Sequence, residues 1–120
     1  MSGPRRVTIC ELPNEPTELA RAWQRLVDHV EGARSDLLLL PEMPFAPWLA
    51  AQPEPHAARW DEAVADHRRW AGRLPAVGLP VLFTAPVVED GRRFNRDFAS
   101  GPDGLVPLHD KYYLPDGEGY

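Results

Sequence analysis

The stretch Leu37–Glu42, LLLLPE, decides the fold of this chain. It consists of four successive leucines that follow Ser35-Asp36 and end at a proline and a glutamate. A short apolar run between turn residues is typical of a strand that is covered on both faces, as in the parallel sheets of α/β proteins. The stretch therefore predicts an α/β fold, with Glu42 placed where a central strand ends.

The segments before this strand predict a strand and a helix. Val7–Leu12 is rich in β-branched residues and predicts a buried first strand. Pro16 fits the first turn of a helix, with Asn14 or Thr17 as its cap. Apolar residues then recur at helical spacing, and Gly32 is expected to end the helix. These apolar residues are Leu19, Trp23, Leu26, Val27 and Val30.

The segments after Glu42 predict a second helix and a hairpin. Beyond a proline-rich loop, Pro41–Gln52, the helical pattern extends over about His56–Leu74. Asp90-Gly91 is a typical hairpin turn, and residues 101–104 turn the chain again. The strands joined by the first turn are Val81–Val88 and Phe94–Ala99. Parallel strands followed by a hairpin predict one α/β domain with a mixed sheet.

Composition excludes several classes of function. The chain has 120 residues, 43% of them hydrophobic, and a formal net charge of −5, so it has no basic surface for nucleic acid or an anionic membrane. A single cysteine, no signal-peptide core and no apolar run long enough to span a bilayer indicate a cytoplasmic protein. The four histidines lack metal-ligand spacing and no glycine-rich phosphate loop occurs, so neither a metal nor a cofactor is expected.

Glu42 is the first candidate for chemistry. Ligands of open α/β sheets bind beyond the carboxyl ends of the strands, where Glu42 is expected. Flanked by Pro41 and Met43, its carboxylate would be partly desolvated, as suits a general base. The alternative is a loop or helix-capping carboxylate.

Lys111 is the second candidate. It is the only lysine among thirteen basic residues, the others being arginine. A compact ammonium near aromatic side chains can stabilise a developing oxyanion, a task for which a guanidinium is not equivalent. The alternative is an exposed lysine paired with Asp110.

Two motifs resemble those of a known family. Leu37–Glu42 is similar to the apolar strand ending in Pro-Glu of the nitrilase superfamily of carbon–nitrogen hydrolases. His109–Pro115, HDKYYLP, is similar to that family's lysine segment, and Asp116–Tyr120 to the stretch after it, which often holds a second glutamate. The order of the motifs and the elements between them also match, so the resemblance covers the whole chain, as the N-terminal portion of such an enzyme.

The resemblance implies an α-β-β-α sandwich and a Cys-Glu-Lys mechanism. Glu42 would be the general base, Lys111 the oxyanion stabiliser and Glu118 a supporting carboxylate. Residues 1–120 would form a partial domain without the nucleophilic cysteine. The intact form would hydrolyse a small amide, nitrile or N-carbamoyl compound, as a homo-oligomer or with a complementing C-terminal portion.

Two further residues and a second function complete the expectations. Cys10 lies in the middle of the first predicted strand, so core packing is expected rather than nucleophilic catalysis. Trp48 lies in the loop after Glu42 and is expected either in the core or lining a substrate pocket.

The alternative function is a non-catalytic binding or assembly subunit. One face of the sheet is expected to lack a partner.

Overall fold

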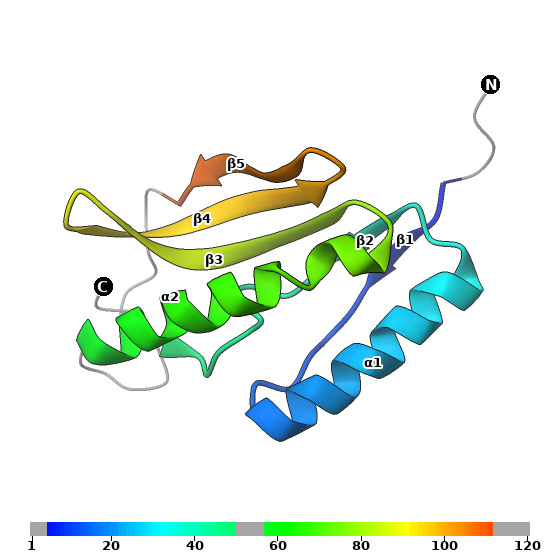
Figure 1. Cartoon of the computed structure of the whole chain (residues 1–120), viewed down its shortest axis with the longest axis horizontal. Helices are drawn as coiled ribbons and strands as arrows, with labels where there is room; N and C mark the ends of the chain where they lie inside the picture. Colours follow the sequence, from blue (N-terminus) through cyan, green and yellow to red (C-terminus); the bar gives the residue numbers. More distant parts are fainter. Residues whose placement is uncertain (1–4, 50–56, 112–120) are drawn as a thin grey trace.

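A single mixed sheet of five strands lies at the centre of the structure, and its spatial order follows the sequence, β1-β2-β3-β4-β5 (Figure 1). The structure is a computed structural model that describes residues 5–49 and 57–111. Strands β1, β2 and β3 are parallel, and β3, β4 and β5 are antiparallel. The strands are β1 (Val7–Ile9), β2 (Leu37–Leu39), β3 (Val81–Glu89), β4 (Arg92–Gly101) and β5 (Gly104–Asp110). The predicted α/β class and mixed sheet are confirmed.

Helix α1 (Pro16–Ala33) forms where its periodicity predicted, but its ends differ. The N-cap is Glu15, whose carboxylate accepts hydrogen bonds from the amides of Thr17 and Glu18, so the expected caps Asn14 and Thr17 are wrong. These two bonds lower the pKa of the Glu15 carboxyl. The helix continues past Gly32 to Ala33, and its C-cap residue Arg34 takes the left-handed conformation with φ 53°.

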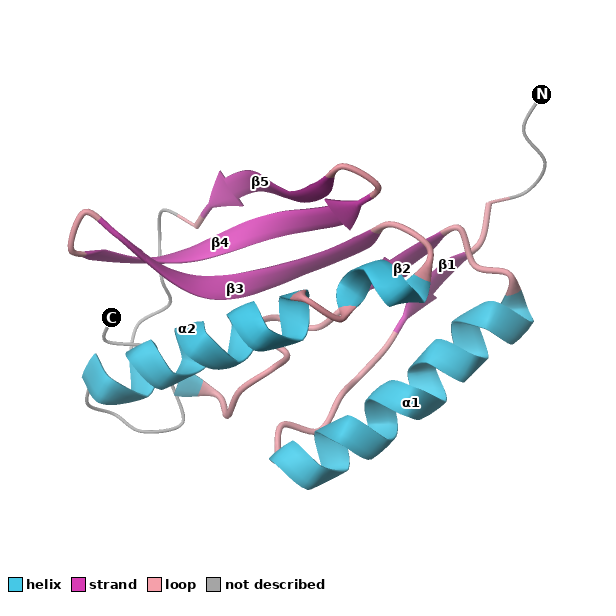
Figure 2. Cartoon of the chain, in the orientation of Figure 1, coloured by secondary structure: helices cyan, strands magenta, loops and turns pink. Residues whose placement is uncertain are grey.

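Helix α2 (Ala57–Ala71) ends before the predicted Leu74, and a short 3₁₀ helix over Leu74–Val77 follows it (Figure 2). The indole Nε1 of Trp60 donates a hydrogen bond to the carbonyl of Val87, which fastens the start of α2 to β3. Within the described residues, no helix is long and apolar enough to cross a membrane.

One face of the sheet, here called the helix-covered face, carries the main core. Apolar residues of α1 and of the sheet pack together in a single cluster. Trp70 and Ala71 of α2 pack against this cluster, and the buried ring of His67 lies next to Phe45 within it. Trp23, Phe45 and Trp70 make edge and stacked ring contacts at its centre. The sheet residues on this face include Leu38, Val81, Phe83 and Ala85. Figure 1 shows α1 and α2 on this side of the sheet.

The opposite face, here called the open face, is not covered by any described helix. Cross-strand pairing and strand alternation place one apolar row on it. This row is Ile9, Leu39, Leu82, Ala99 and Val106. The first strand was expected to be buried, and that prediction is wrong, since β1 is an edge strand with Val7 50% and Ile9 76% exposed. The expectation of an unpartnered face fits the arrangement of the described elements.

The β3–β4–β5 hairpins are longer than predicted. Asp90 and Gly91 turn β3 into β4 with φ of 52° and 73°, the left-handed pair that a type I′ turn requires, as expected. Beyond the turn at residues 101–104, β5 forms a fifth strand that the sequence pattern did not reveal. Its pairing with β4 shifts register between Asp97 and Phe98.

Candidate active site

Glu42 and Lys111, 69 residues apart in sequence, meet in the folded chain. Lys111 Nζ lies 3.4 Å from Glu42 Oε1, and the two groups form an ion pair. Glu42 follows β2 and Lys111 follows β5, so both come from the carboxyl ends of strands. Their side chains are 38% and 37% exposed, which leaves the pair reachable from solvent. The alternative partner for Lys111 was Asp110, and the structure gives Asp110 to Arg96 instead.

Asn95 of β4 joins the two residues. Its side-chain Nδ2 donates a hydrogen bond to Glu42 Oε1, and its backbone carbonyl accepts the amide of Lys111 at 2.9 Å. The residue is only 4% exposed, and its Oδ1 has no hydrogen-bond partner among the described residues. A buried polar atom without a partner costs about 1–3 kcal/mol. Asn95 was not predicted as a site residue, although asparagine is depleted in strands and its place in one was a usable signal.

Two hydrogen bonds hold the loop that carries Glu42. The amide of Met43 donates to Thr84 Oγ1 on β3, and the amide of Phe45 donates to His67 Nε2 on α2. Because His67 Nε2 accepts, Nδ1 must carry the proton that it shares with the Ala63 carbonyl, at 2.7 Å. Burial lowers the pKa of His67, which favours this neutral form. His67 itself is buried, with 2% of its surface exposed.

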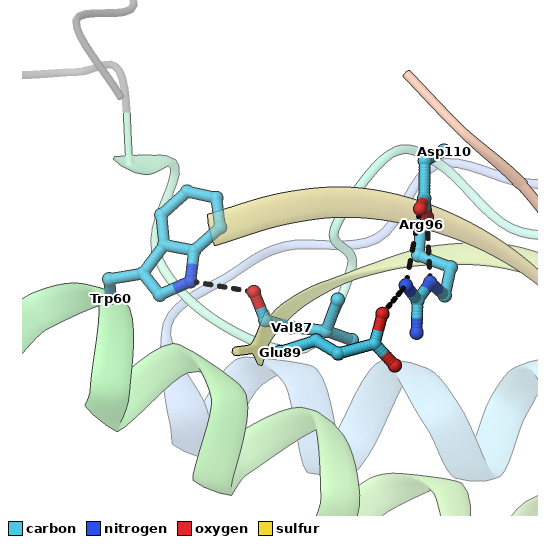
Figure 3. Close-up of polar contacts among 5 residues, drawn as sticks. All are labelled: Trp60, Val87, Glu89, Arg96 and Asp110. Carbon is cyan, nitrogen blue, oxygen red and sulfur yellow. Dashed lines mark hydrogen bonds and ion pairs between the residues drawn. The ribbon is translucent and has the colours of Figure 1, made fainter. Parts of the chain in front are cut away.

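A cluster of charged side chains stabilises the neighbouring position on β5 (Figure 3). Arg96 Nε and Nη2 donate to the two carboxylate oxygens of Asp110 at 2.6 and 3.1 Å. Nη2 also donates to Glu89 at 2.9 Å. The hydrogen bonds from the Arg96 guanidinium lower the pKa of the Asp110 carboxyl. This cluster fixes Asp110, the residue before Lys111, through its side chain.

The other predicted residues have different outcomes. Trp48 is half-buried against a small apolar cluster that includes Met43 and Trp60, and its part in substrate binding stays a prediction. Glu118 lies outside the described residues. The thiol of Cys10 is half-buried, donates to the carbonyl of Leu39 and has a pKa raised by burial to about 11, which favours the packing interpretation.

The helix-covered face has a cavity of its own. It has a volume of about 400 Å³ and lies between α2 and strands β3 to β5, and Phe83, Phe98 and Arg96 are among its lining residues. Neither Glu42 nor Lys111 lines it. Elsewhere in the described part of the chain, no group of three His, Cys, Asp or Glu side chains is placed to hold a metal ion. The described site holds a carboxylate and an ammonium.

The fold and this pair together define a class. A carboxylate accepts a proton and an ammonium stabilises an oxyanion, so the pair has the equipment for acyl transfer at an amide or related carbon, given a nucleophile. An α/β sheet with helices on one face and such a pair beyond its strands is what the resemblance to nitrilase-superfamily hydrolases implied.

Comparison with known proteins supports this class at the level of the fold. No protein-family model and no curated protein sequence matches the chain. Among solved structures, a cysteine variant of the amidase from Nesterenkonia sp. AN1 in complex with butyramide is similar, with 18% identity and a TM-score of 0.65 over 95% of this chain and 45% of that chain. Another variant, described as an amidase from the nitrilase superfamily, gives 17% identity and a TM-score of 0.59 over 96% and 47%.

A second kind of protein is also similar. The glutamine-dependent NAD(+) synthetase from Cytophaga hutchinsonii is 14% identical, with a TM-score of 0.64 over 93% of this chain and 20% of that chain. The chain thus spans less than half the length of these relatives. It has the fold of part of these amidase and synthetase structures, which is the kind of fold that the resemblance predicted.

Proposed function

We propose that this chain supplies the general base and the oxyanion donor of a carbon–nitrogen hydrolase that acts on a small amide. The observation that carries the proposal is the approach of Glu42 and Lys111, two residues far apart in sequence, to 3.4 Å beyond the carboxyl ends of two strands. The similarity to amidase structures supports the class of reaction.

The two carboxylate oxygens of Glu42 differ in the hydrogen bonds that they accept from described residues. Both Asn95 and Lys111 donate to Oε1. Among the described residues, none donates to Oε2, so this oxygen is the one that would take the proton of a thiol nucleophile. The Asn95 bond holds the carboxylate in one orientation while it does so.

The nucleophile would be a cysteine supplied from outside these residues. Cys10 is poorly suited, since its thiol pKa is about 11 and its sulfur faces a backbone carbonyl. The thiolate would attack the amide carbon, and Lys111 would donate a hydrogen bond to the tetrahedral oxyanion. The Glu42 proton would pass to the leaving ammonia, and a water molecule would then release the acid from the thioester.

The substrate class follows from the neighbours. The related amidase variants are described with butyramide and with acrylamide, both short aliphatic amides. We place a short primary amide first for this chain. A nitrile or an N-carbamoyl compound, which the same triad would serve, comes after it.

Ammonia release tests this proposal. The product of the coding sequence that contains residues 1–120 and a downstream cysteine is expected to release ammonia from butyramide, whereas residues 1–120 alone are expected to be inactive. Turnover by the 120-residue chain that survives Cys10→Ser would show that the nucleophile was misassigned. An inactive longer product with bound but unhydrolysed amide would favour a binding subunit.

A further inference from the structure

Two donors share one oxygen of Glu42. Asn95 Nδ2 and Lys111 Nζ both donate to Oε1, the amide at 2.5 Å and the ammonium at 3.4 Å. A hydrogen bond from an ammonium to a carboxylate is usually ~2.7–2.9 Å long, so the ion pair is stretched, whereas the amide contact is close. The carboxylate therefore lies nearer to the neutral amide than to the opposite charge.

The two donors also differ in how firmly they are held. Asn95 is 4% exposed and belongs to β4, which is paired on both sides, with β3 and with β5. The Lys111 side chain is 37% exposed, and its long stem loses conformational entropy when it is held in one place. The buried amide is therefore the stronger constraint on the carboxylate of Glu42.

Asparagine is an unfavourable residue for this position in the fold. Its Oδ1 is buried and accepts no hydrogen bond from the part of the chain that the structure describes, which costs stability. Asparagine is also depleted in strands. A leucine has the same branching and leaves no buried acceptor unpaired. The contact with Glu42 is thus the benefit of the amide that the structure displays.

Without this amide, Glu42 and Lys111 would approach each other, because opposite charges attract and both side chains are partly exposed. An ammonium has three donors, so both carboxylate oxygens would engage it. That closer pair would occupy Oε2, the oxygen assigned to proton transfer. It would also take up the Lys111 donors that are assigned to the oxyanion.

We propose that Asn95 is a positioning residue that holds the carboxylate of Glu42 apart from the ammonium of Lys111. Its side-chain amide sets the carboxylate, and its backbone carbonyl, which accepts the Lys111 amide at 2.9 Å, sets the main chain of the lysine. A substitution of the side chain removes the first contact and keeps the second. The catalytic value of the spacing rests on the proposed function, whereas the spacing itself is measured without turnover.

Two chemical probes of the 120-residue chain report the spacing, because Lys111 is its only lysine. A water-soluble carbodiimide joins Lys111 to Glu42, and succinimidyl acetate acetylates the same amine. Peptide mapping of the monomeric product by mass spectrometry quantifies both. In Asn95→Leu, the initial rate of cross-linking should rise ~3-fold or more and that of acetylation should fall similarly, because the ion pair closes. A site that had merely loosened would show the opposite changes, which would overturn the proposal.

A background without the carboxylate tests whether Asn95 acts through Glu42. In Glu42→Gln no ion pair forms, so the addition of Asn95→Leu should leave the rate of Lys111 acetylation unchanged. An equal fall in acetylation with and without the carboxylate would overturn the proposal. Unchanged rates of both probes in a folded Asn95→Leu chain would overturn it as well.

Urea unfolding separates positioning from support of the fold. The unfolding midpoint of Asn95→Leu should equal or exceed that of the wild type, because an unpaired buried acceptor is removed. Asn95→Val, a second substitution without an amide, guards against a packing effect of leucine. A marked fall of the midpoint or a failure to fold in both variants would show that Asn95 serves the fold, and would overturn the proposal.

Turnover by the longer protein tests the catalytic value of the spacing. With butyramide, Asn95→Leu should lower kcat ~10-fold or more and should cause no further loss when it is added to Glu42→Gln. Full activity of a folded Asn95→Leu would overturn the catalytic value. If both probes behave as expected but the longer protein hydrolyses no amide, the proposed function fails while the spacing by Asn95 stands.

Discussion

The two faces of the sheet differ in how completely they are covered. On the helix-covered face, Leu38 and Val81 are fully buried beneath α1 and its neighbours. On the open face, Ile9 is 76% and Val106 is 47% exposed. Strand alternation places Asn95, which donates a hydrogen bond to Glu42 of the ion pair, on this same face. The difference shows that stability and chemistry are divided between the faces: one holds the domain together, and the other carries the candidate site and apolar area that no described element covers.

Truncating one residue on each face should give very different losses of stability. Leu38→Ala leaves a cavity in the main core and is expected to lower the free energy of unfolding by about 2–5 kcal/mol. Ile9→Ala, on the neighbouring strand, should cost less than about 1 kcal/mol because most of that side chain is already in water. Urea unfolding measures both. Equal losses would mean that the open face is covered in solution.

Association should depend on the open face alone. Each Å² of apolar surface removed from water contributes about 25 cal/mol, so a few hundred Å² give several kcal/mol, enough to drive self-association of the chain. Val106→Lys should shift the species seen by light scattering toward the monomer. Leu105→Lys is the matched control, since Leu105 is similarly exposed but faces the cavity beneath α2. A wild-type chain that is a monodisperse monomer with a sharp melting transition would contradict this expectation and favour a complete domain.

The smallest expected effect is a dependence of stability on pH through His67. The unfolded side chain titrates near ~6.5, and burial lowers the pKa in the folded chain. Between these two values the unfolded chain binds more protons, so stability is fully present above ~6.5 and declines as the pH falls toward the folded pKa.

The variant His67→Gln isolates this contribution. A glutamine keeps one acceptor for Phe45 and one donor for Ala63 but does not titrate. Thermal melts across this pH range should show a smaller decline for the variant than for the wild type. Identical declines would show that other groups cause the effect.

The fold was largely predictable from the sequence because periodicity and turn chemistry mark its elements. Three sequence patterns predicted their elements correctly. They are the apolar run at Leu37–Leu40, the apolar stripe of α1 and the Asp90-Gly91 turn. The burial of β1 was not predictable in this way, since an apolar composition does not distinguish an edge strand from a central one. The cap at Glu15 was missed because glutamate is not among the favoured cap residues.

The two principal residues of the site were predictable from the sequence, but the contacts that hold them in place were not. Glu42 stands out by its place after a strand, and Lys111 by being the only lysine. The place of Asn95 and the register shift between Asp97 and Phe98 depend on the pairing of β4 with β5, which a hydrophobic pattern does not reveal. Which of two neighbouring residues faces Glu42 is therefore decided by tertiary register.

The central claim is tested most directly by measuring kcat for variants of Glu42 and Lys111 in the longer protein. With butyramide as substrate, Glu42→Gln and Lys111→Ala are each expected to lower kcat by at least ~100-fold, the scale of losing a general base or an oxyanion donor. Lys111→Arg should not restore the rate, because the wider guanidinium does not take the place of an ammonium. Glu89→Gln, a carboxylate change outside the pair, serves as the control and should keep nearly full activity. A near-normal kcat in Glu42→Gln or Lys111→Ala would contradict the account and show that the substituted residue has no catalytic role.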